Sequence, residues 1–138
     1  MKWVYDDGGR SQYYKGHTGD CVCRAIAIGT GMDYKKVYDL INTYSKNDDS
    51  YSSARTGVSK DITYQVLTDL GWIWKPTMKF GQGCKTHLNE DELPKNKTII
   101  ARLSKHLTCI IDSTIHDTYD SSRNGKRCVY GYYIKDPV

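Results

Sequence analysis

The spacing of apolar residues changes partway along the chain, and this change limits the possible folds more than any other feature. Before residue 71, apolar side chains recur at the intervals of three and four residues that are typical of amphipathic helices. After residue 97 they gather in short runs rich in β-branched and aromatic residues, which predict strands. Helices followed by closely spaced strands indicate an α+β fold, with N-terminal helices packed on a mainly antiparallel β-sheet.

Three helices are predicted, and each follows a residue that can cap a helix N-terminus. Asp20 precedes "CVCRAIAI", Asp33 precedes the segment 34–44, and Ser59 precedes a third segment that ends at Gly71. A glycine is expected at that end because it readily adopts the left-handed conformation that terminates many helices.

Four strands are predicted in the second half of the chain, after a short extended segment, "WIWKP", and a long loop, "FGQGCKTHLNEDELPKN". Their sequences are "TIIARL", "HLTCIID", "TIHDTYD" and "CVYGYYI". Asp112 and Ser113 separate the second strand from the third and suit a two-residue hairpin turn. In the register that this turn sets, Thr108 lies opposite Asp117, and His106 lies diagonally across from Asp117 on the same face of the sheet. A slip of one residue would reverse that face.

The size and composition of the chain favour one globular domain, which extends over residues 1–138. No internal repeat or long linker divides it, and no apolar run is long enough to span a membrane. The net charge of +4 is too small to indicate a nucleic-acid-binding protein. The basic side chains that could suggest one are interspersed with acids and predict a solvated surface; they are Lys95, Lys97, Arg102, Arg123, Lys126 and Arg127.

The five cysteines show no disulfide framework in their spacing. The first ten residues also contain no apolar core of the length found in signal peptides. We therefore expect free thiols, a reducing environment and a cytoplasmic location, with Cys109 and Cys128 buried in their strands.

Cys21 is the first residue of the first predicted helix, and this position favours a reactive thiol. The unpaired N–H groups and the dipole at a helix N-terminus stabilise a thiolate. Cys23 is turned to a different face of the helix and is expected to pack in the core. A nucleophilic thiol also needs a base, and His106 opens a strand, with Asp117 placed to orient its imidazole and favour its protonated form. Asp120 is the alternative acid if the register slips.

The order of these groups resembles that of the papain-like cysteine peptidase fold: a cysteine that opens an early helix, a histidine that opens a late strand, and an acidic residue on the next strand. The phrases "GDCVCRAIAI", "LSKHLTCIID" and "IHDTYD" are also similar to those of small bacterial and phage proteins of that fold, over residues 7–132. The resemblance implies a single papain-like domain in which Cys21 is the nucleophile, His106 the general base and Asp117 the orienting residue of a Cys-His-Asp triad.

The oxyanion hole is the element in which this chain departs from the resemblance. Papain-like enzymes usually carry a glutamine a few residues before the cysteine, whereas the nearest one here is Gln12, nine residues before Cys21. Its assignment therefore depends on how the intervening loop folds, and the backbone N–H of Cys21 is a further donor. Trp72, Trp74 and Gln82 are assigned to the substrate cleft.

These features predict a cysteine hydrolase that acts on a peptide or isopeptide bond through an acyl-enzyme, without a metal or cofactor. A transglutaminase-like acyl transferase would use the same triad, and a non-catalytic module of phage or bacterial origin would keep the fold to bind a protein. A zinc site is a further alternative, although the spacing of its ligands is unusual; they would be His17, Cys21, Cys23, Cys84 and His87. We expect a protein or peptide as partner, and neither a membrane nor a nucleic acid.

Overall fold

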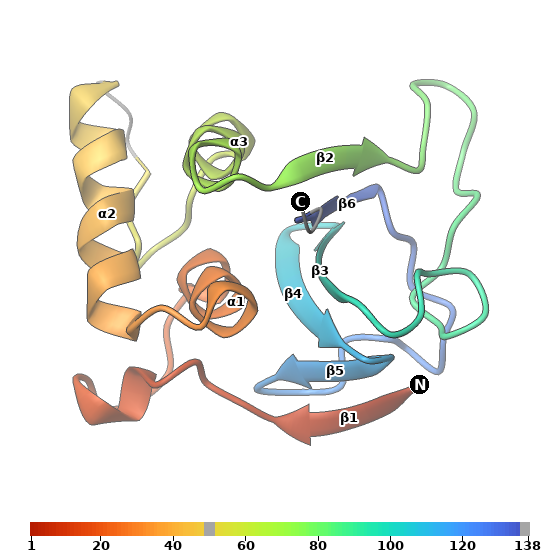
Figure 1. Ribbon diagram of the computed structural model, residues 1–138, viewed down its shortest axis with the longest axis horizontal. Helices are drawn as coiled ribbons and strands as arrows, with labels where there is room; N and C mark the ends of the chain where they lie inside the picture. The colour runs from red at the N-terminus through yellow and green to blue at the C-terminus, as the bar shows by residue number, and fades with distance from the viewer. Residues whose placement is uncertain (49–51, 136–138) are drawn as a thin grey trace.

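Three α-helices form where the apolar spacing predicts them, in a computed structural model that describes residues 1–48 and 52–135. They are α1 (Cys21–Thr30), α2 (Tyr34–Asn47) and α3 (Lys60–Asp69) (Figure 1). Asp33 and Ser59 cap α2 and α3 as predicted, because their side chains accept hydrogen bonds from backbone N–H groups in the first turn. Asp20 also precedes its helix, but its side chain makes no capping bond and is used elsewhere. None of the described helices is both long and apolar enough to cross a membrane.

The described strands form a six-stranded mixed sheet in the order β1-β5-β4-β3-β6-β2. Their bounds are β1 (Lys2–Tyr5), β2 (Ile73–Pro76), β3 (Thr98–Leu103), β4 (His106–Ile111), β5 (Thr114–Asp117) and β6 (Gly131–Ile134). β1 pairs with β5 in parallel, and every other neighbouring pair is antiparallel. The expectation of helices combined with a mainly antiparallel sheet is therefore confirmed.

Two predicted strands are shorter than their sequences suggested. β5 stops at Asp117 because the chain then turns, with the Asp120 carboxylate accepting hydrogen bonds from the backbone N–H and the hydroxyl of Ser122. β6 begins only at Gly131, because the preceding residues pair with a loop instead of the sheet: the N–H of Val129 donates to the carbonyl of Thr86.

The hairpin between β4 and β5 has the predicted register. Asp112 and Ser113 both adopt positive φ angles, 48° and 62°, as a tight two-residue turn requires. Ile111 consequently pairs with Thr114, and the ladder continues to Cys109 opposite His116. This register brings the end of β5 beside the start of β4.

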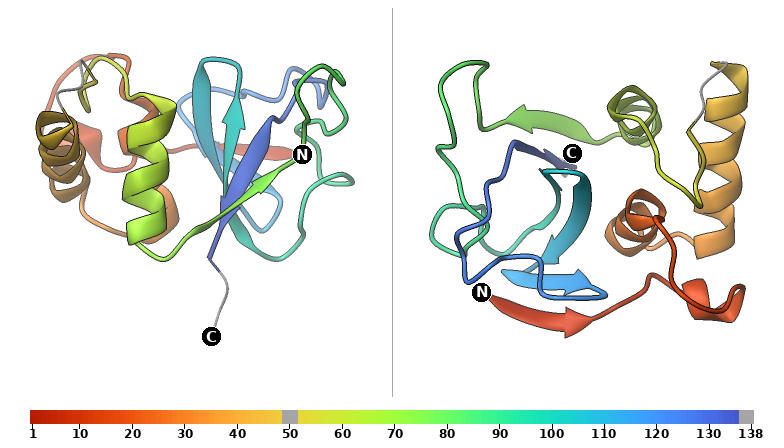
Figure 2. Two further views of the ribbon diagram at one scale, coloured as in Figure 1. Left: turned by 90° about the horizontal axis from the view of Figure 1, so that it is seen from above. Right: turned by 180° about the vertical axis from the view of Figure 1, so that it is seen from behind.

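The helices cover one face of the sheet and the long loop segments cover the other. α1 lies against β4 and β3, and α2 packs outside α1 and α3 (Figures 1 and 2). The core between them includes Trp72, which is only 5% exposed and packs there as a core residue, so its assignment to a substrate cleft stays a prediction. Trp72 directly follows the turn that ends α3, and its indole ring lies between the helices and the sheet, near Gly29 of α1. The second core, on the far face, is closed by Leu88 and Val129.

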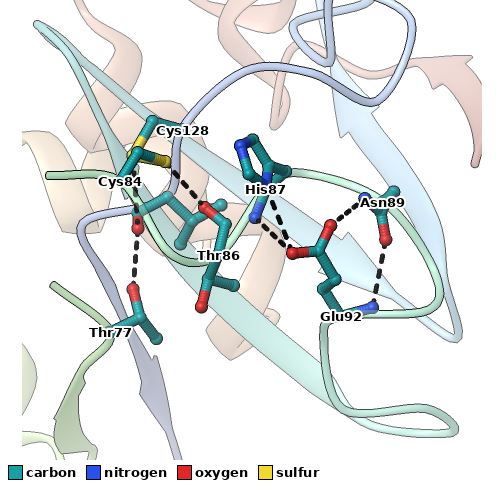
Figure 3. Close-up of a disulfide and its surroundings, with 8 residues drawn as sticks. Thr77, Cys84, Thr86, His87, Asn89, Glu92 and Cys128 are labelled. Atoms are coloured by element: carbon teal, nitrogen blue, oxygen red, sulfur yellow. Dashed lines mark hydrogen bonds and ion pairs between the residues drawn. A yellow bond between two sulfur atoms is a disulfide. The ribbon is translucent and has the colours of Figure 1, made fainter.

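A disulfide fixes the long loop that covers this second core (Figure 3). Cys84 is joined to Cys128, 44 residues away in the sequence. Beside it, the N–H of His87 donates to the carboxylate of Glu92, and Asn89 donates to the same carboxylate (Figure 3). The expectation of five free thiols is therefore wrong for this pair, because the spacing of cysteines cannot reveal that the loop folds back onto the residues before β6. Cys21, Cys23 and Cys109 are free.

Candidate active site

Cys21 stands at the junction of α1 with the start of β4. The side chain of His106 and the backbone N–H of Leu107 lie near enough to its thiol to lower its pKa. As the first helical residue, Cys21 also has an N–H with no acceptor inside the helix, and the Asp20 side chain does not cap it. This N–H is therefore available to a developing oxyanion.

His106 is the first residue of β4 and is 6% exposed. Its Nε2 lies 2.6 Å from Oδ2 of Asp117, so Nδ1 is the ring nitrogen left free to interact with Cys21. The imidazole ring also packs against the ring of Tyr119, with 5.2 Å between the ring centroids. The histidine is thus fixed by the carboxylate of Asp117 and by the ring of Tyr119.

Asp117 is fixed by a set of donors that occupy both of its oxygens. Oδ2 accepts from the hydroxyl of Thr108 at 2.7 Å and from that of Ser121 at 3.4 Å, in addition to His106. Oδ1 accepts from the N–H of Thr118 at 2.7 Å. The rival acid, Asp120, is exposed and bonds Ser122, so it is not the partner of the histidine.

The three groups shift one another toward the ionised forms. Burial raises the pKa of Cys21, but the hydrogen bond and charge of His106 outweigh it, and the pKa lies below its ordinary value. Burial lowers the pKa of His106, yet its bonds to Asp117 and Cys21 leave that pKa above the ordinary value. Burial raises the pKa of Asp117, and the hydrogen bonds from His106 and Thr108 bring it below the ordinary range. This arrangement favours a thiolate beside an imidazolium.

The other two free cysteines have the opposite environment. Burial and the nearby charge of Asp20 raise the pKa of Cys23 to about 12, and its thiol donates to the carbonyl of Tyr34 at 3.7 Å. Burial also raises the pKa of Cys109, which is fully enclosed in the core. Cys21 alone among the described free thiols is placed to react as a nucleophile.

A buried ionic network behind Cys21 was not predicted from the sequence. Arg24 lies on the next turn of α1, where it pairs with Asp20 and places Nη2 3.8 Å from Oδ1 of Asp117. Asp20 also accepts from the hydroxyl of Tyr34 at 2.6 Å and from Arg10 at 3.4 Å. The spacing of Asp20 and Arg24 in the sequence, four residues on a helix, was the one signal that could have indicated the first of these contacts. The network fixes the start of α1 and brings a positive charge toward the thiol.

The remaining predicted site residues are not brought together with Cys21 by any described contact. Gln12 is exposed at the end of a short 3-10 helix (Arg10–Gln12), where its amide lies beside Gly9. Gln82 is exposed in the loop that carries Cys84. Trp74, in contrast, lines a pocket of about 340 Å³ next to β3 and β6.

The residues of the alternative zinc site are dispersed. Cys84 is in the disulfide, His87 interacts with Glu92, and Cys23 points to a backbone carbonyl. Within residues 1–48 and 52–135, no three or more His, Cys, Asp or Glu side chains are grouped so that they could hold a metal ion.

Comparison with known proteins does not assign the chain to a family. No protein-family model, no curated protein and no solved structure matches it significantly. The function of the site is therefore inferred from its geometry.

Proposed function

We propose that the protein is a cysteine hydrolase of the papain-like type, with Cys21, His106 and Asp117 as its catalytic triad. The observation that carries the proposal is a histidine bonded at 2.6 Å to a buried carboxylate, with a cysteine near enough for that histidine to lower the pKa of its thiol. A thiolate is the reactive form of cysteine, and a neighbouring imidazolium stabilises it at neutral pH.

The reaction would proceed through a thioester. The Cys21 thiolate attacks the carbonyl carbon of an amide, and the oxyanion that forms is stabilised by the N–H of Cys21. The His106 imidazolium gives its proton to the leaving amine as the C–N bond breaks, which leaves an acyl group on sulfur and a neutral imidazole. His106 then takes a proton from water, the hydroxide adds to the thioester, and the carboxylic acid departs as the thiolate is restored. Asp117 keeps the ring oriented through both steps.

The substrate that fits this chemistry is a peptide or isopeptide bond. An amine that replaced water in the second step would make the protein an acyl transferase, with the same groups in the same roles. A bacterial or phage origin and a cytoplasmic location stay predictions. Because disulfides are typical of oxidising compartments, the redox state of Cys84 and Cys128 in the producing cell tests the location.

The test is acylation by p-nitrophenyl acetate, followed by mass spectrometry of the intact protein and of the peptide that contains Cys21. We expect a burst of nitrophenol, an acetyl group on Cys21 and continued turnover. His106→Ala should abolish turnover, whereas His116→Ala is the matched control because His116 bonds Asp6 outside the site. Free acetate as the product indicates a hydrolase, and transfer to added glycinamide indicates a transferase.

Two outcomes would contradict the proposal. Acylation spread equally over the free cysteines would mean that Cys21 is not activated. Acylation of Cys21 without any turnover that depends on His106 would favour the non-catalytic module.

A further inference from the structure

A buried arginine with an unsatisfied nitrogen lines a pocket next to β3. Arg102 is 8% exposed, and its buried Nη2 has no hydrogen-bond partner among the described residues. Within the described residues, no carboxylate forms an ion pair with its guanidinium. Buried charges are costly and are nearly always paired, so an arginine of this kind is expected to bind a ligand.

Arg102 lines a pocket with aromatic walls. The cavity has a volume of about 340 Å³ and is formed by residues of α3, β2, β3 and β6 and by Tyr130 just before β6 (the elements are labelled in Figure 1). Its aromatic side chains are Tyr64, Trp74, Tyr130 and Tyr133. Lys60 and Asp61 are exposed at its edge.

One aromatic wall depends on a glycine of β6. Trp74 and Tyr133 pack with 4.8 Å between their ring centroids. A Cβ on Gly131 would lie 2.3 Å from the Trp74 ring, so only glycine permits the indole to lie directly on the backbone at this position. Gly131 is also the ladder partner of Arg102, which places the tryptophan and the guanidinium in the same pocket.

The pocket is close to the nucleophile. Arg102 pairs across the β3–β4 ladder with Leu107, whose backbone N–H is one of the groups that lower the pKa of Cys21. Burial lowers the pKa of Arg102, and the nearby Cys21 partly offsets this. Burial raises the pKa of Tyr133 to about 12, so that phenol is neutral at physiological pH.

We propose that this pocket binds a carboxylate of the substrate through Arg102, and that the enzyme prefers an acyl chain with an acidic group near the bond it cleaves. The identification of the ligand as a substrate rests on the function proposed above. A guanidinium pairs with a carboxylate through charge-assisted hydrogen bonds, and the aromatic walls can accept the apolar stem of the side chain. The carboxylate comes either from a glutamate or aspartate side chain or from a chain terminus.

The test measures binding to the Cys21→Ser protein by fluorescence of its tryptophans, so that it requires no catalysis. Acetyl-Leu-Glu-amide and acetyl-Leu-Gln-amide differ only in the side-chain charge. Acetyl-Leu-Leu and its amide differ only in the terminal charge. We expect the charged member of at least one pair to bind about tenfold more tightly or better. The first pair reports a side-chain carboxylate and the second a terminal one.

Variants of the pocket identify the group responsible. Arg102→Met should remove the preference and raise Tm by a few degrees, because it replaces an unpaired buried charge with an apolar chain of similar volume. Arg102→Lys keeps the positive charge but lacks the planar guanidinium group, so it should retain part of the preference for the charged ligand. Arg55→Met, the matched control at an exposed arginine outside the pocket, should retain the preference.

Equal affinities within both pairs, or a preference that survives Arg102→Met, would overturn the inference. A fall in Tm for Arg102→Met would overturn it as well, because it would mean that the arginine stabilises the fold. These results do not depend on the reactivity of Cys21, so they are distinguishable from a failure of the triad.

Discussion

Replacing Asp117 by asparagine removes the charge that faces His106 while leaving the shape of the side chain almost unchanged. The Oδ2 atom of Asp117 lies 2.6 Å from Nε2, and both residues are buried, with exposed fractions of 3% and 6%. The amide oxygen of asparagine can still accept a hydrogen bond from the ring. What is lost is the charge that keeps the imidazole protonated beside the thiolate of Cys21.

The size of the effect follows from the geometry of this pair. A hydrogen bond to a buried charged group contributes about 1.5–3 kcal/mol. Arg24, 3.8 Å from Oδ1, partly offsets the loss, because without the Asp117 charge it acts more strongly on the thiolate. The lower end of the range therefore applies and corresponds to about a tenfold smaller population of the ion pair at neutral pH.

Alkylation by iodoacetamide measures this population. The rate constant for Cys21, followed by mass spectrometry of its peptide, should fall about tenfold at neutral pH in Asp117→Asn. At alkaline pH, where the thiol is ionised in both proteins, the two rates should converge. Asp120→Asn is the control and should leave the profile unchanged, because the Asp120 carboxylate accepts hydrogen bonds from Ser122 and makes no described contact with His106. A profile for Asp117→Asn that coincides with that of the unaltered protein would refute the role assigned to this carboxylate.

The parts of the site that could be predicted from the sequence are those set by local rules. The turn at Asp112 and Ser113 fixed the register of β4 and β5, and with it the placement of His106 beside Asp117. Helix phase likewise separated Cys21 from Cys23, which the structure places in different environments.

The features that could not be predicted depend on contacts between distant segments. Asp20 has the sequence context of a helix cap, but Arg10 and Tyr34 converge on it and take its carboxylate into a buried network. The disulfide and the Arg102 pocket each join segments that are far apart in the chain. The alternation of polar and apolar residues along a strand does not show whether a charged side chain has an ion-pair partner. From the sequence, Arg102 was therefore interpreted as one of several charges on a solvated surface.

Three further predictions concern stability. The pKa of Asp117 is lowered and that of His106 is raised, so the pair stabilises the fold at pH values between those two pKa values. This contribution is lost as pH falls through the pKa of Asp117 or rises through the pKa of His106. The difference in Tm between the unaltered protein and Asp117→Asn should therefore be largest in that interval and should shrink on both sides of it. Removing the disulfide with Cys84→Ser and Cys128→Ser should lower the free energy of unfolding, measured in urea, by up to about 4 kcal/mol, which is the chain-entropy value for a loop of this length. The rate of alkylation of Cys21 should not change. An unaltered urea midpoint would mean that the disulfide does not constrain the unfolded chain. Gly131→Ala should lower the free energy of unfolding by about 1–3 kcal/mol, because the added Cβ displaces Trp74. Most of this loss should disappear when the same substitution is made in the Trp74→Leu protein. An equal loss in both proteins would mean that the indole ring is not what the Cβ displaces.

The most direct test of the triad is the titration of the Cys21 thiolate. Its ultraviolet absorbance is obtained as the difference between the unaltered protein and Cys21→Ser, which cancels the tyrosines and the other cysteines. We predict that the thiolate forms below the ordinary pKa of cysteine, because His106 is charged beside it, and that His106→Ala moves its titration upward. A Cys21 thiol that titrates at or above the ordinary value, with no change in His106→Ala, would contradict the assignment of this cysteine as an activated nucleophile.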